Sequence, residues 1–308
     1  MDAVLDWGID AIVWLRQTLP GLTTPFEMFT YLGNEMFYLL FMPFVYWCLD
    51  RRTGARLTLL FLACAYSNTV VKLLADQPRP FDRALDRMAP LYRYPLAEII
   101  ERYEASGGGF PSGHTQNTVV IWGYVASQFK RTWLWVLAGL LMLLVPLSRI
   151  YLAVHFPHDV LGGYVIGALL LVLYLWLEPK AEGWLEKSGL GWQLGLAVAI
   201  PILLTLALLN ESGVTTGATL LGMGVGFVLE RRWVGFDSDG VWWRRGLRYL
   251  PGVVVMFILY AGLKAAFSSL EPALLFRFVR YTLIGLWGGL GAPWAFVKLR
   301  LAEGRLRR

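Results

Sequence analysis

The sequence predicts an all-α membrane protein, a polytopic bundle of about nine transmembrane helices after an N-terminal amphipathic helix. Three observations predict this fold class. Apolar residues make up 56% of the 308 residues and charged residues only 16%, whereas soluble domains carry about 25% charged residues. The mean hydropathy is +0.52. Apolar segments of the length that a spanning helix needs, about 20 residues, follow one another along the chain.

Other classes of protein fit this composition poorly. The net charge is +6, but the Lys and Arg residues stand in short clusters between apolar runs, which is typical of membrane topology. We therefore expect no nucleic-acid partner. The two cysteines, Cys48 and Cys64, both lie in apolar stretches, which excludes a disulfide scaffold and predicts that they pack as small apolar groups.

Residues 1–25 are expected to form an amphipathic helix that lies in the membrane interface. Acidic and apolar residues alternate over residues 3–19, with Trp7 and Trp14 among the apolar ones, and Pro20 ends the segment. The alternative is a poorly inserted first span, but three aspartates would be costly in hydrocarbon. The same aspartates stand where a cleavable signal peptide would carry Lys or Arg, so no such peptide is expected.

Nine apolar segments of spanning length follow this helix. The first five belong to a core over residues 26–178, and the other four to a C-terminal extension over residues 179–308. The seventh segment is short and rich in glycine, which makes it the weakest of the nine. The predicted spans cover residues 26–49, 55–75, 114–130, 133–150, 158–177, 191–209, 214–230, 249–268 and 278–297.

Basic clusters predict the orientation of the spans. Five clusters fall on one side of the membrane if all nine segments cross it, and that side is the cytoplasm by the positive-inside rule. The N-terminus is then outside and the C-terminus inside. The clusters are Arg51, Arg52 and Arg56; Lys130 and Arg131; Lys180 and Lys187; Arg231, Arg232, Arg244, Arg245 and Arg248; and Lys298, Arg300, Arg305, Arg307 and Arg308.

Two outward segments, residues 76–113 and 148–159, carry basic residues against this rule. Polar loops that break the charge pattern often carry function, and basic residues there predict an anionic ligand on the outer side. Lys264, Arg277 and Arg280 lie near the last outward turn. They either add to this positive field or are ordinary interfacial residues with long apolar stems.

Three polar stretches at outward ends of spans hold the residues that can carry chemistry. They are Lys72-LLADQP-Arg79-Pro80, Pro111-Ser112-Gly113-His114 and Ser148-Arg149-IYLAV-His155-FPH-Asp159. The cations Lys72, Arg79 and Arg149 would repel one another unless an anion with several oxygens joins them, and phosphate meets this requirement. Ser112 and Gly113 precede a helix start, whose free N–H groups form a further anion site.

Two of the three histidines fit an acid–base pair around this anion. His155 and Asp159 are four residues apart, so they can touch in a helical segment, and the carboxylate would fix the tautomer that makes the other ring nitrogen a nucleophile. His114 is then the general acid for the leaving alcohol. His158 lies outside the pattern and is expected to have a supporting or surface role. The sequence has no acidic cluster suited to Mg²⁺, so neither a metal nor a cofactor is expected.

These three stretches match a known signature. With Lys-x6-Arg-Pro, Pro-Ser-Gly-His and Ser-Arg-x5-His-x3-Asp in order, the chain resembles the type-2 phosphatidic acid phosphatase superfamily, the lipid phosphate phosphatases. The resemblance implies that residues 26–178 form a helical phosphatase core with its site at the outer leaflet. It implies His155 as nucleophile, Asp159 as its partner and His114 as general acid. The residues that it assigns to phosphate binding are Lys72, Arg79, Ser112, Gly113 and Arg149.

The first span carries a finer resemblance. The run Leu32-Gly33-Asn34-Glu35-Met36-Phe37-Tyr38 is similar to the first span of sphingosine-1-phosphate phosphatases, although that branch usually reads Pro-Ser-Thr-His in the second motif. Glu35 is an intramembrane acid and therefore a candidate accessory residue. It would pair with Lys72 or Arg79 or contact a head group, and the alternative is a structural contact between helices. Hydrogen bonding between helices is expected for Asn68, Gln116 and Asn117.

The sequence thus predicts a multi-pass phosphatase that releases phosphate from a lipid phosphomonoester or diphosphate, through a phosphohistidine and without a metal. Its predicted partners are the membrane and the lipid phosphate, and the choice of lipid and the oligomeric state stay open. In a bacterium the membrane would be the cytoplasmic one, with the site facing outward. The alternatives are a lipid phosphotransferase with the same phosphohistidine and a non-catalytic lipid phosphate transporter.

Overall fold

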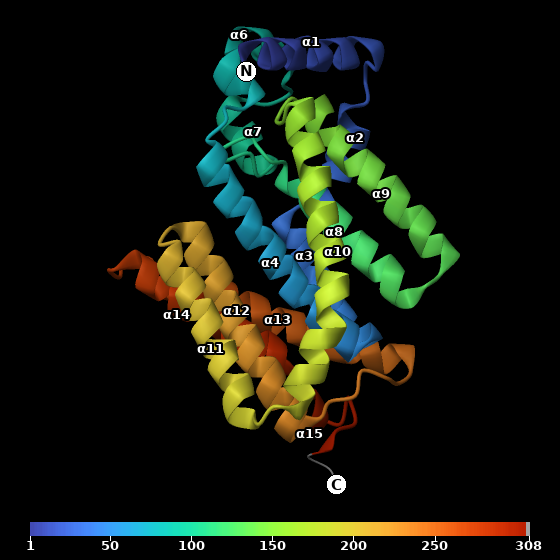
Figure 1. Ribbon diagram of the computed structural model, residues 1–308, viewed down its shortest axis with the longest axis vertical. Helices are drawn as coiled ribbons and strands as arrows, with labels where there is room; N and C mark the ends of the chain where they lie inside the picture. The colour runs from blue at the N-terminus through green and yellow to red at the C-terminus, as the bar shows by residue number, and fades with distance from the viewer. Residues whose placement is uncertain (306–308) are drawn as a thin grey trace. The chain divides into compact units, whose positions relative to one another are not determined.

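Every regular element of the described chain is a helix (Figure 1). The computed structural model describes residues 1–305. The helices of the N-terminal half are α1 (Asp2–Thr18), α2 (Thr23–Tyr31), α3 (Glu35–Phe44), η1 (Val45–Leu49), α4 (Arg51–Ala75), α5 (Pro80–Arg83), α6 (Leu85–Met88), η2 (Ala89–Leu91), α7 (Leu96–Arg102), α8 (Gly113–Phe129) and α9 (Thr132–Tyr151). Those that follow are α10 (Pro157–Lys187), α11 (Leu190–Ala207), α12 (Glu211–Leu229), η3 (Glu230–Val234), α13 (Trp242–Ala266), α14 (Ala273–Leu286), η4 (Trp287–Gly291) and α15 (Ala292–Lys298).

The chain forms two compact units, and both are discontinuous in sequence. The first unit comprises Met1–Tyr38 and Ser67–Leu175, and the second comprises Leu39–Tyr66 and Trp176–Arg308. All three polar stretches of the sequence fall in the first unit. The helices α3, α4 and α10 contribute residues to both units.

Helix α8 forms the buried centre of the first unit. Twelve of its residues are buried, and it packs along α9, which in turn contacts α2. Ser112 caps its N-terminus, because the hydroxyl accepts a hydrogen bond from the Thr115 amide. The cap places the next two residues, Gly113 and His114, in the first helical turn.

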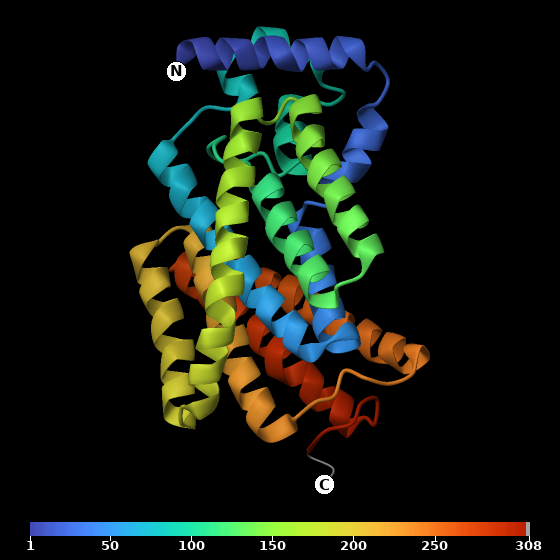
Figure 2. The same ribbon diagram turned by 45° about the vertical axis from the view of Figure 1, so that its right-hand side comes forward.

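Helix α1 lies across the ends of α9 and α10 in the first unit (Figure 2). Its buried stripe of Leu5, Ile9 and Ile12 packs in one cluster with Phe156, next to His155 in the chain. Two arginines of the segment after α4 pair with aspartates on a neighbouring side of α1. These ion pairs join Arg83 to Asp2 at 3.1 Å and to Asp6 at 3.4 Å, and Arg87 to Asp10 at 2.7 Å.

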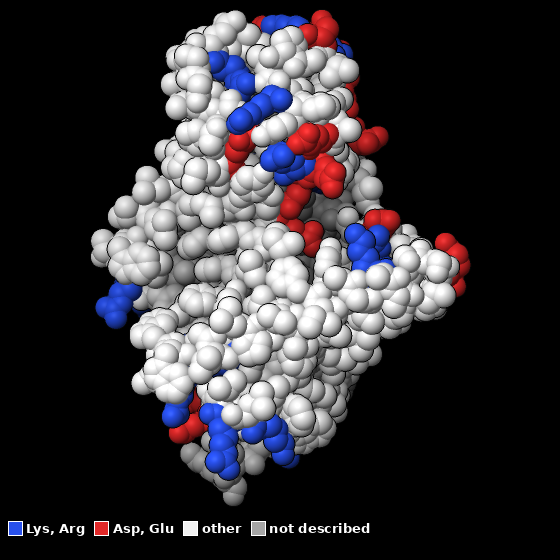
Figure 3. All heavy atoms as spheres, turned by 180° about the vertical axis from the view of Figure 1, so that it is seen from behind, with Lys and Arg blue, Asp and Glu red and all other residues white. Residues whose placement is uncertain are grey.

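The predicted outward loop 76–113 is folded in short helices. It contains α5, α6, η2 and α7. Buried side chains of α5 and α7 share one apolar cluster with α2 and the end of α9, and Met88 of α6 packs in the cluster under α1. Charged side chains of both signs gather on this part of the first unit (Figure 3). The segment is therefore a packed layer rather than a flexible connection.

The predicted first span, residues 26–49, is bent. Helices α2 and α3 meet at 47° across a break at residues 32–34. Gly33 sits in this break, and a Cβ atom there would lie 2.6 Å from Cδ2 of His114. The bend thus brings Gly33 and Asn34 against the start of α8.

Among residues 1–305, seven helices are long and apolar enough to cross a membrane, or eight if the bent pair α2–α3 is one span. The prediction of nine spans differs at α8, which has 17 residues and begins with the polar run His114-Thr115-Gln116-Asn117. Buried polar side chains lower its hydropathy. The segment 214–230, the weakest of the predicted spans, is part of a spanning-length helix, Glu211–Val234.

The second unit is built around α12 and α14, which pack at very close range through glycine. A Cβ atom on Gly222 would lie 2.2 Å from the backbone oxygen of Thr282, and one on Gly285 would lie 2.8 Å from that of Thr219. Small residues of this kind are what helix pairs in membranes use for close approach.

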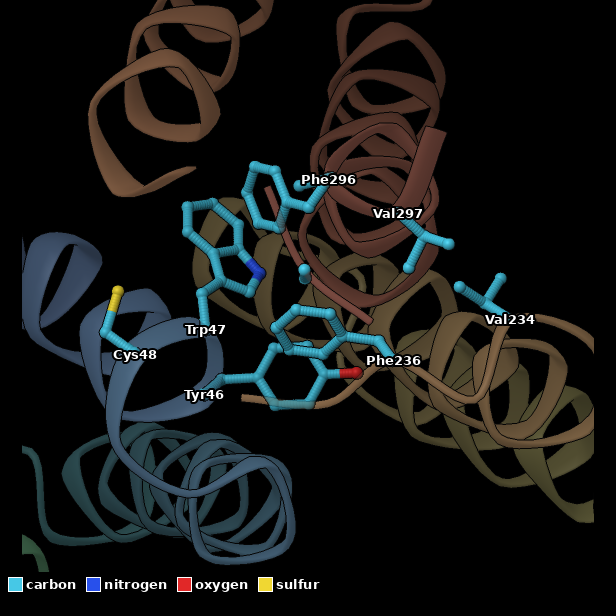
Figure 4. Packing of buried hydrophobic residues seen from close by; sticks show 9 residues of the cluster. Tyr46, Trp47, Cys48, Val234, Phe236, Phe296 and Val297 are labelled. Atoms are coloured by element: carbon cyan, nitrogen blue, oxygen red, sulfur yellow. The ribbon is translucent and has the colours of Figure 1, made fainter. Parts of the chain in front are cut away.

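The same unit also contains a cluster of buried residues, in which aromatic side chains from η1 pack against the chain's last helices (Figure 4). The Trp47 and Phe296 rings lie 5.4 Å apart, edge to face, and Trp47 donates a hydrogen bond to the Gly288 carbonyl at 3.0 Å. Nearby, Arg51 pairs with the buried carboxylate of Glu230 at 3.1 Å. Residues 45–51 are thereby anchored in the C-terminal part of the chain.

Substitution Gly222→Ala tests the helix contact. The new methyl group meets backbone, which cannot rotate away, so we expect a loss of about 1–3 kcal/mol in the free energy of unfolding. The matched control is Gly224→Ala on the same helix, whose Cβ would make an ordinary 3.5 Å contact with Ala197. A detergent melt should show a lower Tm for Gly222→Ala alone. Equal Tm values for the two variants would contradict the close packing.

Candidate active site

The first unit brings the three polar stretches together. Lys72 lies near the end of α4, Arg79 caps α5, and Arg149 lies in the last turn of α9. His155 occupies the turn between α9 and α10, and Asp159 the first turn of α10. Both arginines, His155 and Asp159 are at most 1% exposed.

His155 and Asp159 touch, as their spacing predicts. The Asp159 Oδ2 atom lies 3.2 Å from Nδ1 of His155 and also accepts a hydrogen bond from the Phe156 amide at 2.9 Å. Because a carboxylate accepts, Nδ1 carries the proton and Nε2 keeps its lone pair. Nε2 faces Nη1 of Arg79 at 3.2 Å. The nitrogen with the free electron pair therefore points at the cations.

Burial lowers the pKa of His155 well below its usual 6.5, and the neighbouring charges of Arg79, Arg149 and Lys72 lower it further. An imidazole without its proton is the nucleophilic form. The site thus holds His155 in this form at neutral pH.

His114 lies at the other arginine. Its Nε2 atom is 2.8 Å from the Asn34 amide oxygen and 3.2 Å from Nη1 of Arg149. An amide oxygen accepts, so this contact corresponds to a proton on Nε2. A carboxylate oxygen of Glu104 lies 4.0 Å from the same nitrogen. The Asn34 contact thus favours a proton on Nε2 of His114, whereas the Arg149 guanidinium, which only donates, favours a lone pair on the same nitrogen.

One backbone segment, Tyr103–Gly108, receives hydrogen bonds from all three cations. Lys72 donates to the Gly108 carbonyl at 2.7 Å, and Arg149 donates to the Tyr103 carbonyl at 2.6 Å. Arg79 donates to the carbonyls of Ser106 at 3.1 Å and Gly107 at 2.9 Å. Backbone carbonyls orient these cations but carry no net charge, so the site keeps an excess of positive charge.

Ser112 and Gly113 occupy the start of α8, as predicted. The Ser112 amide donates to the Asp159 carbonyl at 2.9 Å, which links the second stretch to the third. His158 has a supporting position: its Nε2 lies 2.9 Å from the Gln77 amide oxygen and 3.2 Å from Asp159 Oδ1. Ser112 is fully buried and its hydroxyl is used within the first turn of α8.

Glu104 and Asn34 contact the site without belonging to the three stretches. Both carboxylate oxygens of Glu104 accept from the Glu35 amide, at 3.0 and 3.2 Å, at the start of α3. Glu104 has a φ of +50°, a conformation that costs energy for a residue with a side chain. Nothing in the spacing of the sequence marks Glu104. Glu35, the predicted accessory residue, contributes this backbone contact, and its side chain is exposed.

Comparison with known proteins agrees with this arrangement. Residues 53–182 match the model of the PAP2 superfamily, and residues 214–304 match that of the PAP2 superfamily phosphatase, transmembrane extension. The two matches contain the three polar stretches and most of the chain after α11. The chain belongs to the PAP2 superfamily, as an integral multi-pass membrane protein.

Three curated relatives indicate the range of the superfamily. Lipid phosphate phosphatase delta of Arabidopsis thaliana is 31% identical, with 59% of this chain matched to 44% of that protein. Glucose-6-phosphatase 3 of Mus musculus is 29% identical over 77% of this chain and 71% of its own. Sphingosine-1-phosphate phosphatase 2 of Homo sapiens is 33% identical over 48% of this chain and 36% of its own.

A solved structure is also similar. It is the transmembrane PAP2-type phosphatidylglycerolphosphate phosphatase from Bacillus subtilis, with a TM-score of 0.44 and 25% identity. The similarity covers 58% of this chain and 86% of that one.

Substitution Gly33→Ala tests the contact between the bend and the site. The added Cβ would lie 2.6 Å from the His114 ring and 2.9 Å from Val145, so the ring must move. A displacement of about 1 Å at a reacting group costs about 100-fold in rate, and we expect that fall in phosphate release from a soluble phosphomonoester. Gly139→Ala, in open space on α9, is the control. Full activity of Gly33→Ala would contradict the contact.

The protonation of His155 is a second test. Selective ¹⁵N labelling of the ring nitrogens gives signals from only three histidines, and His155→Ala assigns one of them. Because the pKa of His155 is depressed, its ring should stay neutral at about pH 6, where an ordinary histidine is mostly protonated. The unfolded chain takes up that proton, so stability should fall as the pH drops below about 6.5. A His155 signal that titrates near pH 6.5 would refute the argument.

Proposed function

We propose that the chain is a lipid phosphate phosphatase that works through a phosphohistidine on His155, without a metal. One observation carries this proposal: the His155 nitrogen opposite the Asp159 contact faces Arg79 at 3.2 Å. A nucleophile aimed into a cluster of cations is suited to attack on an anionic phosphorus. Among residues 1–305, no group of three or more His, Cys, Asp and Glu side chains is placed to hold a metal ion.

In the first step, the lone pair on His155 Nε2 forms a bond to phosphorus as the phosphorus–oxygen bond to the leaving alcohol breaks. Burial and the neighbouring cations lower the pKa of His114 well below 6.5, and the negative charge of a bound phosphate would favour its protonated form. In that form His114 gives its Nε2 proton to the leaving oxygen. The Glu104 carboxylate, 4.0 Å away, balances the charge of the protonated ring. Lys72, Arg79 and Arg149 stabilise the charge on the phosphoryl oxygens, together with the amides at the start of α8.

In the second step, water replaces the alcohol. His114, now neutral, takes a proton from the water while its oxygen attacks phosphorus. The nitrogen–phosphorus bond breaks, the electron pair returns to His155, and phosphate leaves. Asp159 keeps the imidazole oriented through both steps.

The site faces the outer side of the membrane in this proposal. The basic clusters then lie inside by the positive-inside rule. The buried apolar face of α1 rests on the layer that contains the site, while Trp7 and Trp14 are more than half exposed. Tryptophans at such a position suit the boundary between lipid and water, where a lipid head group would arrive.

The substrate class has two candidates. The names of the plant and human relatives support a lipid phosphate, including a sphingoid base phosphate. The name of the mouse relative supports a sugar phosphate, and its similarity covers the larger part of this chain, 77%. We favour the lipid because the cationic site belongs to a multi-pass membrane protein whose tail-binding surface would be the bilayer itself.

Phosphate release in detergent with excess EDTA tests the proposal. Wild-type protein should release phosphate from a panel of lipid phosphates and diphosphates, and His155→Ala should lower the rate by at least about 10⁴-fold, since it removes the nucleophile. Glucose 6-phosphate in the same panel separates the two substrate classes. Activity that needs added metal, or that survives in His155→Ala, would overturn the mechanism.

The two alternative functions, a lipid phosphotransferase and a lipid phosphate transporter, would give different results in this assay. A phosphotransferase would release little phosphate alone and would form a product only when an acceptor alcohol is added. A transporter would release none and would keep its lipid movement in His155→Ala.

A further inference from the structure

The second unit contains a buried arginine that no carboxylate of the described chain neutralises. Arg280 lies in the middle of α14, in a helix of spanning length, and is 9% exposed. None of the ion pairs among residues 1–305 includes it, and its Nε atom is buried without a hydrogen-bond partner. An unpaired charge in a membrane helix is unfavourable, so such a residue generally has a partner or a function.

Two tyrosine rings, which meet edge to face at 75°, lie within cation–π distance of the guanidinium. Its central carbon lies 4.8 Å from the ring centre of Tyr281 and 5.8 Å from that of Tyr260 on α13. Cation–π contacts of this kind stabilise the charge of a guanidinium. They supply no hydrogen-bond acceptor in the ring plane, and no hydrogen bond or ion pair among residues 1–305 includes Arg280. The tyrosine contacts therefore stabilise the charge of the guanidinium and leave its N–H donors available for an anion.

The charges around Arg280 leave an excess of positive charge at this end of the second unit. Arg277, one turn earlier on α14, pairs with Glu211 at 2.7 Å. The Glu271 carboxylate accepts from the Ala273 amide at 2.7 Å and caps α14. Lys264 is exposed near the end of α13. Both acids in these turns are thus already engaged, and neither contacts Arg280.

The depth of Arg280 indicates what kind of anion can reach it. Arg280 lies seven residues after the first residue of α14, which is about 10 Å along the helix at 1.5 Å per residue. A hydrocarbon layer is about 30 Å thick, so a span that begins at the start of α14 or later places Arg280 in the third of the layer nearest that end. The phosphate of a lipid head group sits at the edge of that layer, within reach of a long side chain.

We propose that Arg280 is the centre of a second anion-binding site that takes the phosphate group of an anionic phospholipid. The planar fork of arginine matches two phosphate oxygens, and the two tyrosine rings pre-position it. The site is made from residues of α13 and α14, shares none with the active site, and does not depend on the phosphatase proposal. The lipid would act as a bound structural partner of the C-terminal extension.

Binding of a short-chain lipid tests this site. Full-length protein in uncharged detergent is titrated with dioctanoyl phosphatidylglycerol, and the rise of the tryptophan-detected Tm gives an apparent Kd. We expect the apparent Kd of Arg280→Met to be about tenfold weaker than that of the wild type, the loss of one charge-assisted contact. The matched control Lys264→Met removes an exposed cation at the same end and should bind as the wild type does. Dioctanoylglycerol, with the same tails and no phosphate, should not raise the Tm of any variant.

Inorganic phosphate distinguishes the source of the anion. It should raise the Tm of the wild type and of Arg280→Met equally, because it binds in the active site of both. If Arg280→Met binds the lipid as tightly as the wild type, the site is refuted. If inorganic phosphate raises the Tm of the wild type but not that of Arg280→Met, the site binds free phosphate and the assignment to a phospholipid is wrong. If Arg280→Met fails to fold, Arg280→Lys replaces it, because lysine keeps the charge without the planar fork. An apparent Kd of Arg280→Lys equal to that of the wild type would also refute the site.

Discussion

The structure of the first unit depends on holding three cations close together through backbone carbonyls. Lys72, Arg79 and Arg149 all donate to backbone carbonyls of the single segment Tyr103–Gly108. Carboxylates in these places would neutralise the cations and compete with phosphate, whereas carbonyls satisfy N–H groups and leave the charge unbalanced. These hydrogen bonds thus hold the cations in place and leave the site with an excess of positive charge. A buried excess of charge is costly, and the packed layers around it must compensate.

The packing around the site explains what the helices without motif residues contribute. The segment is anchored by Tyr103, whose ring is buried in the cluster with Phe26 and Tyr151, and whose hydroxyl donates to the buried Glu27 at 2.6 Å. The bend between α2 and α3 lets Asn34 meet His114. Helix α1 covers the turn that holds His155 from the other side. Each of these contacts restrains a side chain of the candidate site, directly or through the backbone that carries it, and so preserves the geometry of the site.

The sequence predicted which charged and titratable side chains cluster better than it predicted the backbone that supports them. Lys72, Arg79, His114, Arg149 and His155 could be found because side chains with charge or a titrating ring recur at spacings that a helix makes adjacent. The carbonyls of residues 103–108 leave no trace in a sequence, since every residue has one, and Glu104 is one acid among several in its segment. The predicted spans coincide with helical segments. Two of them differ from a simple span: polar residues shorten the apolar part of α8, and the segment with Gly33 bends. Mean hydropathy cannot reveal such a bend. The grouping of residues 39–66 with the C-terminal unit rests on long-range packing and was not predictable from local pattern.

The central claim is that His155 becomes covalently phosphorylated, and rapid quenching tests it most directly. Wild-type protein is mixed with a ³²P-labelled lipid phosphate and stopped in alkali, in which phosphohistidine is stable. Mass spectrometry then locates the label. We predict phosphate on His155, formed and lost at rates that match turnover, and none in His155→Ala. Turnover with no labelled enzyme, or label on another residue, would contradict the account.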